Sequence, residues 1–171
     1  MWVPPACVAS ALAGMPAVAA DYLSVAEAQR LIFPRAQFTQ ADLTLTDPQA
    51  DELGRVSGTT VYRKQVKVWR VSTGGWFFLD QVPGREDRIT YAVGVDADGS
   101  IKSIEVLACD AEYDQVRGPW SRNFVGRHYS RVHLSKAVPN ISGATLSAAH
   151  IADGVTRILA TYALFLAPRD G

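Results

Sequence analysis

The sequence predicts an α+β domain in which an antiparallel β meander packs against a long C-terminal helix, with short helices near the N-terminus. Three observations carry this prediction. Four strand-like runs follow one another between residues 61 and 107, and their short connections favour antiparallel neighbours. One long amphipathic segment, residues 146–166, comes near the end of the chain. Two short segments with helix-start signals precede the strands.

The composition is that of one globular domain. The chain has 171 residues, of which 48% are hydrophobic and 20% charged, and this is enough apolar material for a single core. Lys+Arg and Asp+Glu both number 17, so the formal net charge is zero. Nothing in this balance favours nucleic acid or an anionic membrane surface as a partner.

The first residues have the character of a leader. Residues 1–20 carry no charge, are rich in Ala, and end in small residues suited to cleavage before Asp21. We expect a signal peptide over residues 1–20, a single domain over residues 21–171, and a periplasmic or otherwise extracytoplasmic location. A membrane span is disfavoured because the run is short and broken by Pro and Gly. The usual positive start is missing, so either the true start lies upstream or the leader is atypical.

Each expected N-terminal helix starts with a capping pattern. A Ser followed three residues later by Glu predicts a capping box, and an Asp-Pro pair places Pro in a first helical turn. The polar, Gly-containing residues 55–60 are expected to form a loop. The expected helices are residues 24–33, with Ser24 and Glu27 as the box and Pro34 as the stop, and residues 47–53, with Asp47 as the cap.

Alternation of apolar and polar residues defines the meander. Gly-Gly, Pro-Gly and Asp-Gly pairs lie in the turns between its strands. The alternation favours one face against a core and the other partly wet. The turn that ends at Gly99 resembles the start of a calcium loop, but the further ligand spacing is missing, so a hairpin turn is expected. The expected strands are residues 61–71, 76–79, 89–95 and 101–107.

The most informative stretch is residues 142–147, Ser-Gly-Ala-Thr-Leu-Ser, directly before the long amphipathic segment. Ser142 is a candidate N-cap. Gly143 and Ala144 add little bulk, so another group can approach the backbone closely. The open N–H groups of a first helical turn favour an anion, and Thr145 and Ser147 add hydroxyls there. These residues suit a phosphate, although most helix starts of this kind are simple caps.

This motif, placed after a meander and before the last helix, resembles that of the FMN-binding domain family. The family includes flavin-carrying subunits of the sodium-translocating NADH:quinone reductase and of the Rnf electron-transport complex. The resemblance extends to the strand near Trp76, to residues 91–99 and to Phe124-Val125-Gly126-Arg127, which fits the family's aromatic-x-Gly-basic pattern. It implies that Thr145 accepts FMN as a phosphoester from FAD, through a separate flavin transferase.

By the same resemblance the protein is an electron-transfer carrier between membrane or periplasmic redox proteins, rather than an enzyme with its own substrate. The family usually has an acidic residue three positions before the Ser, where this chain has Pro139. Non-covalent FMN, or a periplasmic ligand-binding or sensory module of the same fold, therefore stays open as an alternative. The expected cofactor-binding residues are Thr145, Ser142, Gly143, Ala144, Leu146, Ser147, Tyr113, Arg117 and Trp120. For the last three, ordinary packing of a loop over the core is an equal alternative.

Other chemistry has weaker support. The three His residues lack the spacing of a metal site, and phosphate-binding and dinucleotide-binding glycine motifs are missing. Ser147 and His150 lie one helical turn apart, and this weakly suggests hydrolysis, but the sequence has no Gly-x-Ser-x-Gly elbow. We expect no metal and no catalytic residue.

Overall fold

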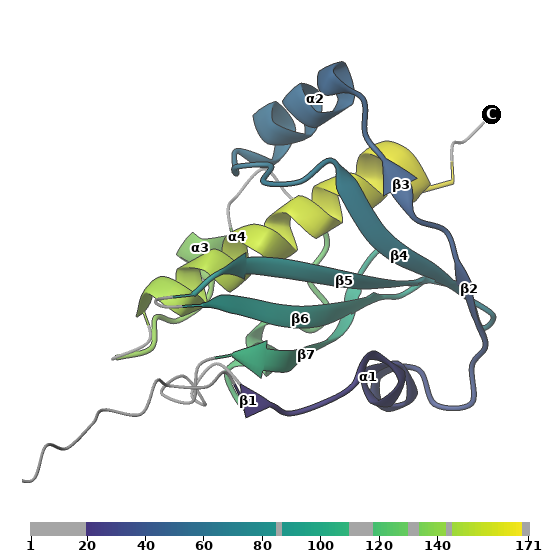
Figure 1. Ribbon diagram of the computed structural model, residues 1–171, viewed down its shortest axis with the longest axis horizontal. Coiled ribbons are helices and arrows are strands. Elements are labelled where there is room, and N and C mark those ends of the chain that lie inside the picture. The colour runs from purple at the N-terminus through teal and green to yellow at the C-terminus, as the bar shows by residue number, and fades with distance from the viewer. Residues whose placement is uncertain (1–19, 85–86, 110–117, 130–133, 143–144, 169–171) are drawn as a thin grey trace, which may run out of the picture.

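One antiparallel sheet organises the protein, and the α+β prediction is confirmed. The computed structural model describes residues 20–84, 87–109, 118–129, 134–142 and 145–168. The seven strands lie in the order β1-β7-β6-β5-β4-β2, with β3 also paired to β4 (Figure 1). The strands are β1 (Ala20–Asp21), β2 (Phe38–Gln40), β3 (Leu43–Thr44), β4 (Gln65–Val71), β5 (Trp76–Pro83), β6 (Arg88–Val95) and β7 (Ile101–Cys109).

The helices are α1 (Val25–Ile32), α2 (Asp47–Ser57), the 3-10 helix η2 (Ser121–Phe124), α3 (Leu134–Ala137), α4 (Thr145–Thr161) and the π-helical turn η3 (Tyr162–Leu166). Helix α1 starts as predicted. The Ser24 hydroxyl accepts from the Glu27 amide at 3.3 Å, and the Glu27 carboxylate accepts from the Ser24 amide at 2.8 Å. The backbone amides of Ser24 and Glu27 are thereby both hydrogen-bonded by side chains close in the sequence.

Helix α2 differs from the prediction at both ends. Its N-cap is Thr46 rather than Asp47, because the Thr46 hydroxyl accepts from the Gln49 amide while the Gln49 side chain accepts from the Thr46 amide. The helix then continues to Ser57, through part of the expected loop. It ends at Gly58, whose φ of 63° is the left-handed conformation that glycine adopts without strain.

The strands of the meander also differ from their expected bounds. β4 begins at Gln65 rather than at residue 61; just before it, the Lys64 carbonyl accepts from the Leu45 amide at 2.9 Å, which extends the pairing with β3 by one residue. β5 continues beyond residue 79 to Pro83 and pairs along its length with β6. The short strands β1, β2 and β3 were not expected from the sequence.

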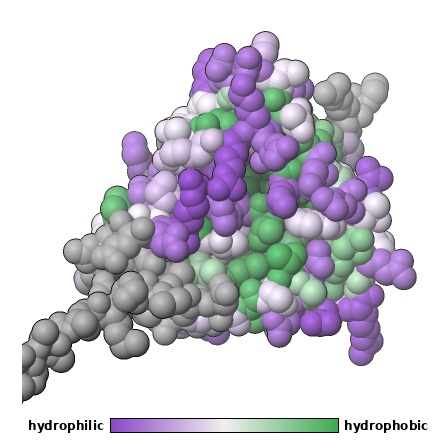
Figure 2. Space-filling model, viewed as in Figure 1, coloured by the Kyte–Doolittle hydropathy of each residue, from purple (hydrophilic) through white to green (hydrophobic). Residues whose placement is uncertain are grey.

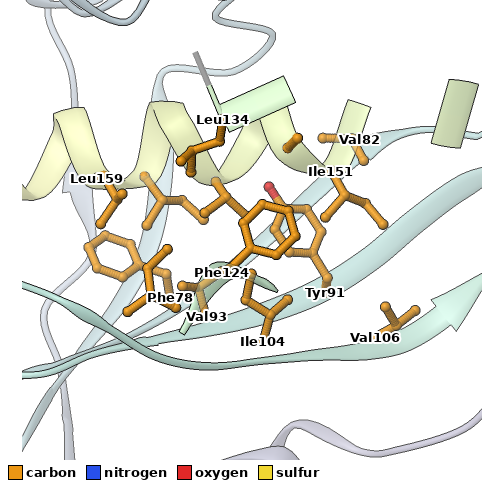
Figure 3. Packing of buried hydrophobic residues seen from close by; sticks show 14 of the residues in the cluster. Phe78, Val82, Tyr91, Val93, Ile104, Val106, Phe124, Leu134, Ile151 and Leu159 are labelled. Atoms are coloured by element: carbon orange, nitrogen blue, oxygen red, sulfur yellow. The ribbon is translucent and has the colours of Figure 1, made fainter. Parts of the chain in front are cut away.

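The sheet carries apolar packing on both faces, but one face is only partly covered, in agreement with the prediction of one partly wet face. Helix α4 covers one face, where Figure 3 shows Phe78, Tyr91, Phe124 and Ile151 packed together. Helix α1 covers part of the other face, over buried residues that include Phe77. Figure 2 shows apolar surface left on that side, between α1 and α2. Half-buried residues there are Phe38, Trp69 and Leu79.

The closing helix begins and ends earlier than predicted. Ordinary α-helical structure runs from Thr145 to Thr161, and η3 completes the expected segment. Its apolar spacing was predicted correctly for Ile151, Val155 and Leu159, which are all buried. Leu146, the first residue of the expected segment, is 58% exposed. It lies in the first turn of α4, beyond the end of the packed interface.

A buried polar cluster joins α4 to the sheet. The Tyr91 hydroxyl of β6 donates to Asp80 Oδ2 of β5 at 2.8 Å, and Arg157 of α4 donates to the same oxygen at 2.6 Å. Arg157 also donates to the Thr60 carbonyl at 2.9 Å. Burial on its own would lower the pKa of Arg157, but the charge and hydrogen bond of Asp80, together with the nearby Tyr91 and Tyr62, outweigh burial and raise that pKa above its ordinary value. Burial of the phenol and the charge of Asp80 raise the pKa of Tyr91 well above 10.0.

Gly154 lets this cluster form. A Cβ at position 154 would overlap the Tyr91 hydroxyl and press on the Val82 side chain. The sequence alone suggests only that this glycine weakens the helix. The structure instead shows that the missing side chain allows α4 to approach β5 and β6 closely.

We predict that Gly154→Ala lowers the free energy of unfolding by about 1–3 kcal/mol, the usual cost of overpacking a core. Helix propensity alone predicts the opposite sign, a gain of about 1 kcal/mol. Urea unfolding measures the difference. Adding Tyr91→Phe, which removes the overlapped hydroxyl, should recover part of the loss. A Gly154→Ala variant more stable than the parent would show that the close approach does not exist.

We also predict that stability falls in alkali through Tyr91. The unfolded chain loses the phenolic proton near pH 10, whereas the folded chain keeps it to higher pH because its pKa is raised. The contribution of Tyr91 is therefore complete below about pH 10 and declines above it, by at most about 1.4 kcal/mol per pH unit. Urea unfolding of the parent and of Tyr91→Phe, at pH 8 and pH 11, isolates this contribution. Equal losses in the two proteins would contradict it.

Candidate functional site

The predicted motif lies at the start of α4, and its acceptor hydroxyl is at the surface. Ser142 and Thr145 are both exposed, and Thr145 is the first residue of the helix. The Thr145 hydroxyl donates to the Ile141 carbonyl at 2.8 Å. Ile141 itself packs against the main core, so the turn before the helix is anchored from below. Gly143 and Ala144 lie outside the described residues.

The remaining two motif residues point in different directions. Leu146 is 58% exposed beside Thr145, so an apolar side chain is available to a bound molecule there. Ser147 is only 2% exposed and lies on the buried side of α4. Of the three predicted hydroxyls in the described motif, those of Ser142 and Thr145 are therefore the ones that a ligand at the surface can reach.

Trp120 packs against the approach to the motif. Its indole N–H donates to the Pro139 carbonyl at 2.8 Å, and its ring meets Phe124 edge-on, with ring centroids 5.0 Å apart. Only 8% of Trp120 is exposed, so most of its surface is already engaged in protein contacts. Tyr113 and Arg117, the other members of the expected aromatic–basic cluster, lie outside the described residues. The expectation that these three residues contact a cofactor ring stays a prediction.

The contact between Trp120 and Pro139 was missed by sequence reasoning. No local pattern links two residues that are 19 positions apart. The only signal was the pair of unusual residues themselves: a Trp after Gly118-Pro119, and a Pro where the resembled family has an acid. Neither indicates a hydrogen bond without coordinates.

The Ser147–His150 alternative receives no support from the geometry. His150 Nδ1 lies 2.7 Å from the Pro83 carbonyl, and because a carbonyl only accepts, this nitrogen carries the proton. That bond ties α4 to the end of β5. The Ser147 hydroxyl is buried, so a substrate does not reach it. A nucleophile must be accessible as well as close to its base.

Two hollows lined by described residues lie away from Thr145. One, of about 510 Å³, is lined by Asp96, Ala97 and Lys102 among others. Tyr162, just after α4, donates to the Ala97 carbonyl at 3.3 Å, so this hollow lies at the far end of the helix. Another, of about 40 Å³, reaches Arg157 and Asp80 and is small enough for only a few water molecules.

Two further findings concern the described part of the chain. Within it, no group of three or more His, Cys, Asp or Glu side chains is placed to hold a metal ion. Its helices are too short or too polar for any of them to cross a membrane.

The donor set at the start of α4 fits a phosphate ester. Attachment requires an accessible hydroxyl, and Thr145 supplies one at the first position of a 17-residue helix. The partial positive charge of a helix start favours the phosphate anion. The second exposed hydroxyl, on Ser142, is available to hydrogen-bond a phosphate oxygen.

Comparison with known sequences points to the same segment. Residues 84–160 match the FMN-binding domain family. The matched range covers β6, β7, η2 and α3, and it contains the whole motif and nearly all of α4; β1 to β5, α1 and α2 precede it. Among curated proteins and among solved structures, none is significantly similar to this chain. Residues 84–160 therefore resemble an FMN-binding domain, and this match supports FMN as the cofactor.

Proposed function

We propose that this protein is an extracytoplasmic electron carrier that holds FMN through a phosphoester bond to Thr145. The observation that carries the proposal is the position of that residue. Within the matched range, Thr145 is the exposed first residue of α4, and the turn before it is anchored in the core. A hydroxyl in this place is open to solvent and lies in the favourable field of a helix start.

The other residues of the site have supporting roles. The Ser142 hydroxyl and the open backbone N–H groups of the first turn hold the phosphate oxygens. Leu146 offers apolar surface to the non-phosphate part of the cofactor. Ile141 holds the Thr145 hydroxyl through its carbonyl until the ester forms. Afterwards Thr145 has no proton to donate, and the Ile141 carbonyl loses this partner.

Attachment needs a separate flavin transferase and FAD as the donor. The Thr145 oxygen gains a bond to the flavin phosphorus, the pyrophosphate bond of FAD breaks, and AMP leaves. The hydroxyl proton passes to a base of the transferase. This division of labour agrees with the surroundings of Thr145, where the nearest hydrogen-bond partner is a backbone carbonyl rather than a general base.

Bound FMN supplies transfer of one or two electrons, and the protein supplies its position and electrostatic environment. Membrane or periplasmic redox proteins are the proposed donors and acceptors. A covalent link suits the location that the leader-like residues 1–20 suggest, because cofactor lost outside the cytoplasm is not replaced. No substrate of its own is proposed.

Pro139 favours a second candidate, in which FMN is held without the ester. The resembled family has an acidic side chain at this position, and the transferase is expected to read it. Pro139 cannot supply a carboxylate. It occupies the same place before the motif, and its backbone carbonyl accepts from the Trp120 indole. In this candidate the same helix start holds the phosphate by hydrogen bonds alone.

The decisive change is Thr145→Ala. The parent, co-expressed with a flavin transferase, should gain the mass of one FMN less one water over its unmodified mature chain. Thr145→Ala should gain nothing, because it lacks the oxygen that forms the ester. Intact mass of the denatured proteins measures both.

Two matched variants complete the test. Thr145→Ser keeps a hydroxyl and should retain part of the attachment, whereas Ser147→Ala changes a buried hydroxyl and should retain all of it. A parent that binds flavin but loses its colour on denaturation would replace the covalent proposal with the non-covalent one. Equal flavin masses in the parent and Thr145→Ala would place the ester on another residue.

A further inference from the structure

The geometry points to Trp120 and Arg127 as positioning residues that hold the approach to the flavin motif by its backbone carbonyls. This inference rests on the proposed function for its consequence, but not for its contacts. Nothing in the resemblance or in the family match assigns either residue such a role. Neither residue needs to touch the cofactor.

The element that carries both residues is fixed to the sheet. η2 buries Phe124 completely against the main core. Just after it, the Gly126 amide donates to the Ile101 carbonyl at 2.8 Å, and the Ile101 amide donates to the Arg127 carbonyl at 2.9 Å. These bonds continue from the start of β7. Residues 120–127 therefore form a rigid base rather than a free loop.

From this base, two side chains reach the segment that leads into the motif. The Trp120 indole donates to the Pro139 carbonyl at 2.8 Å. The Arg127 guanidinium donates to the Ala137 carbonyl at 3.3 Å, while its Nε donates to the Asn123 carbonyl at 2.6 Å and so fixes the side chain. Two carbonyls, two residues apart, are thus held from one side.

The other end of the same segment is held by α4. The Leu134 amide donates to the Thr156 hydroxyl at 3.3 Å, and Leu134 and Val138 are buried in the main core. α3 is a single turn of four residues. Its position depends on these outside contacts.

The bonds to Ala137 and Pro139 therefore determine where residues 140–142 and the start of α4 lie before flavin arrives. An indole N–H and a guanidinium suit this role because both groups only donate hydrogen bonds, and both are planar and rigid. Pro139 adds a fixed φ and has no amide that could seek another partner. The proline that departs from the family pattern thus helps to hold the motif.

The experiment compares Trp120→Phe with Trp69→Phe in the full chain. Both changes replace an indole ring, packed edge-on against a Phe, with a smaller ring. The ring centroids lie 5.6 Å apart for Trp69 and Phe77, and 5.0 Å apart for Trp120 and Phe124. Only Trp120→Phe removes the bond to Pro139. Amide hydrogen exchange of residues 138–147, without flavin, should speed up roughly fivefold in Trp120→Phe, the effect of one lost hydrogen bond, and stay unchanged in Trp69→Phe.

The initial rate of flavin attachment, with purified transferase and FAD, should fall by a similar factor in Trp120→Phe alone. Arg127→Lys serves as a second variant at a part-exposed position, where folding is not at risk. It keeps the charge but loses the fork that bridges two carbonyls, so exchange should again speed up in residues 138–147.

Unchanged exchange in both Trp120→Phe and Arg127→Lys would overturn the inference. So would faster exchange with an unchanged attachment rate, because the contacts would then not position the motif. If the parent itself accepts no flavin, the proposed function fails, and the exchange result alone decides whether these side chains hold the segment.

Discussion

The close approach of α4 to the sheet at Gly154 is the constraint on which the rest of the structure depends. The missing side chain lets the Tyr91 hydroxyl and Val82 lie directly under the helix, and this sets the depth of packing. One turn later, Arg157 bonds Asp80, and this sets the rotation of the helix about its axis. Since a helix is stiff, both settings are transmitted to its first turn, where Ser147 faces inward and Thr145 and Leu146 face outward. The exposure of the Thr145 hydroxyl is thus decided by contacts two to three turns away.

The polar cluster at this interface serves geometry more than net stability. Removing a guanidinium from water costs several kcal/mol, and its pairing with a carboxylate only roughly offsets that cost. Asp80 Oδ2 accepts from both Tyr91 and Arg157, so these groups satisfy one another only in one register of α4 on β5 and β6. Apolar contacts alone would let the helix slide and repack. In any other register, however, a buried charge would be left unsatisfied, and this is costly. We interpret the cluster as the feature that selects a single placement of the helix.

Local signals in the sequence were sufficient for most of the sheet and for one helix start. The Ser24–Glu27 box and the strands of the meander depend on residues close in the chain, and the structure confirms them. Most of the misses have non-local causes. β1, β2 and β3 are two or three residues long and exist because a longer strand lies beside them. Gly154 reads as a weak helix former until Tyr91 is placed beneath it, and the bond from Trp120 to Pro139 has no local pattern. At α2 the Asp-Pro pair was a stronger signal than the Thr46–Gln49 box that actually caps the helix.

The proposed phosphoester at Thr145 would fix only one atom of a large cofactor, so the orientation of the ring would have to come from the surface around it. Leu146 is suited to this because a large apolar side chain exposed on the first turn of α4 gains by being covered. Val125, also exposed, belongs to the base formed by residues 120–127, which holds the approach to the motif. The same rigid base therefore carries an exposed apolar side chain as well as the groups that donate to the backbone before the motif. The proposed carrier role would require a ring that is held in one place but left open to its redox partners.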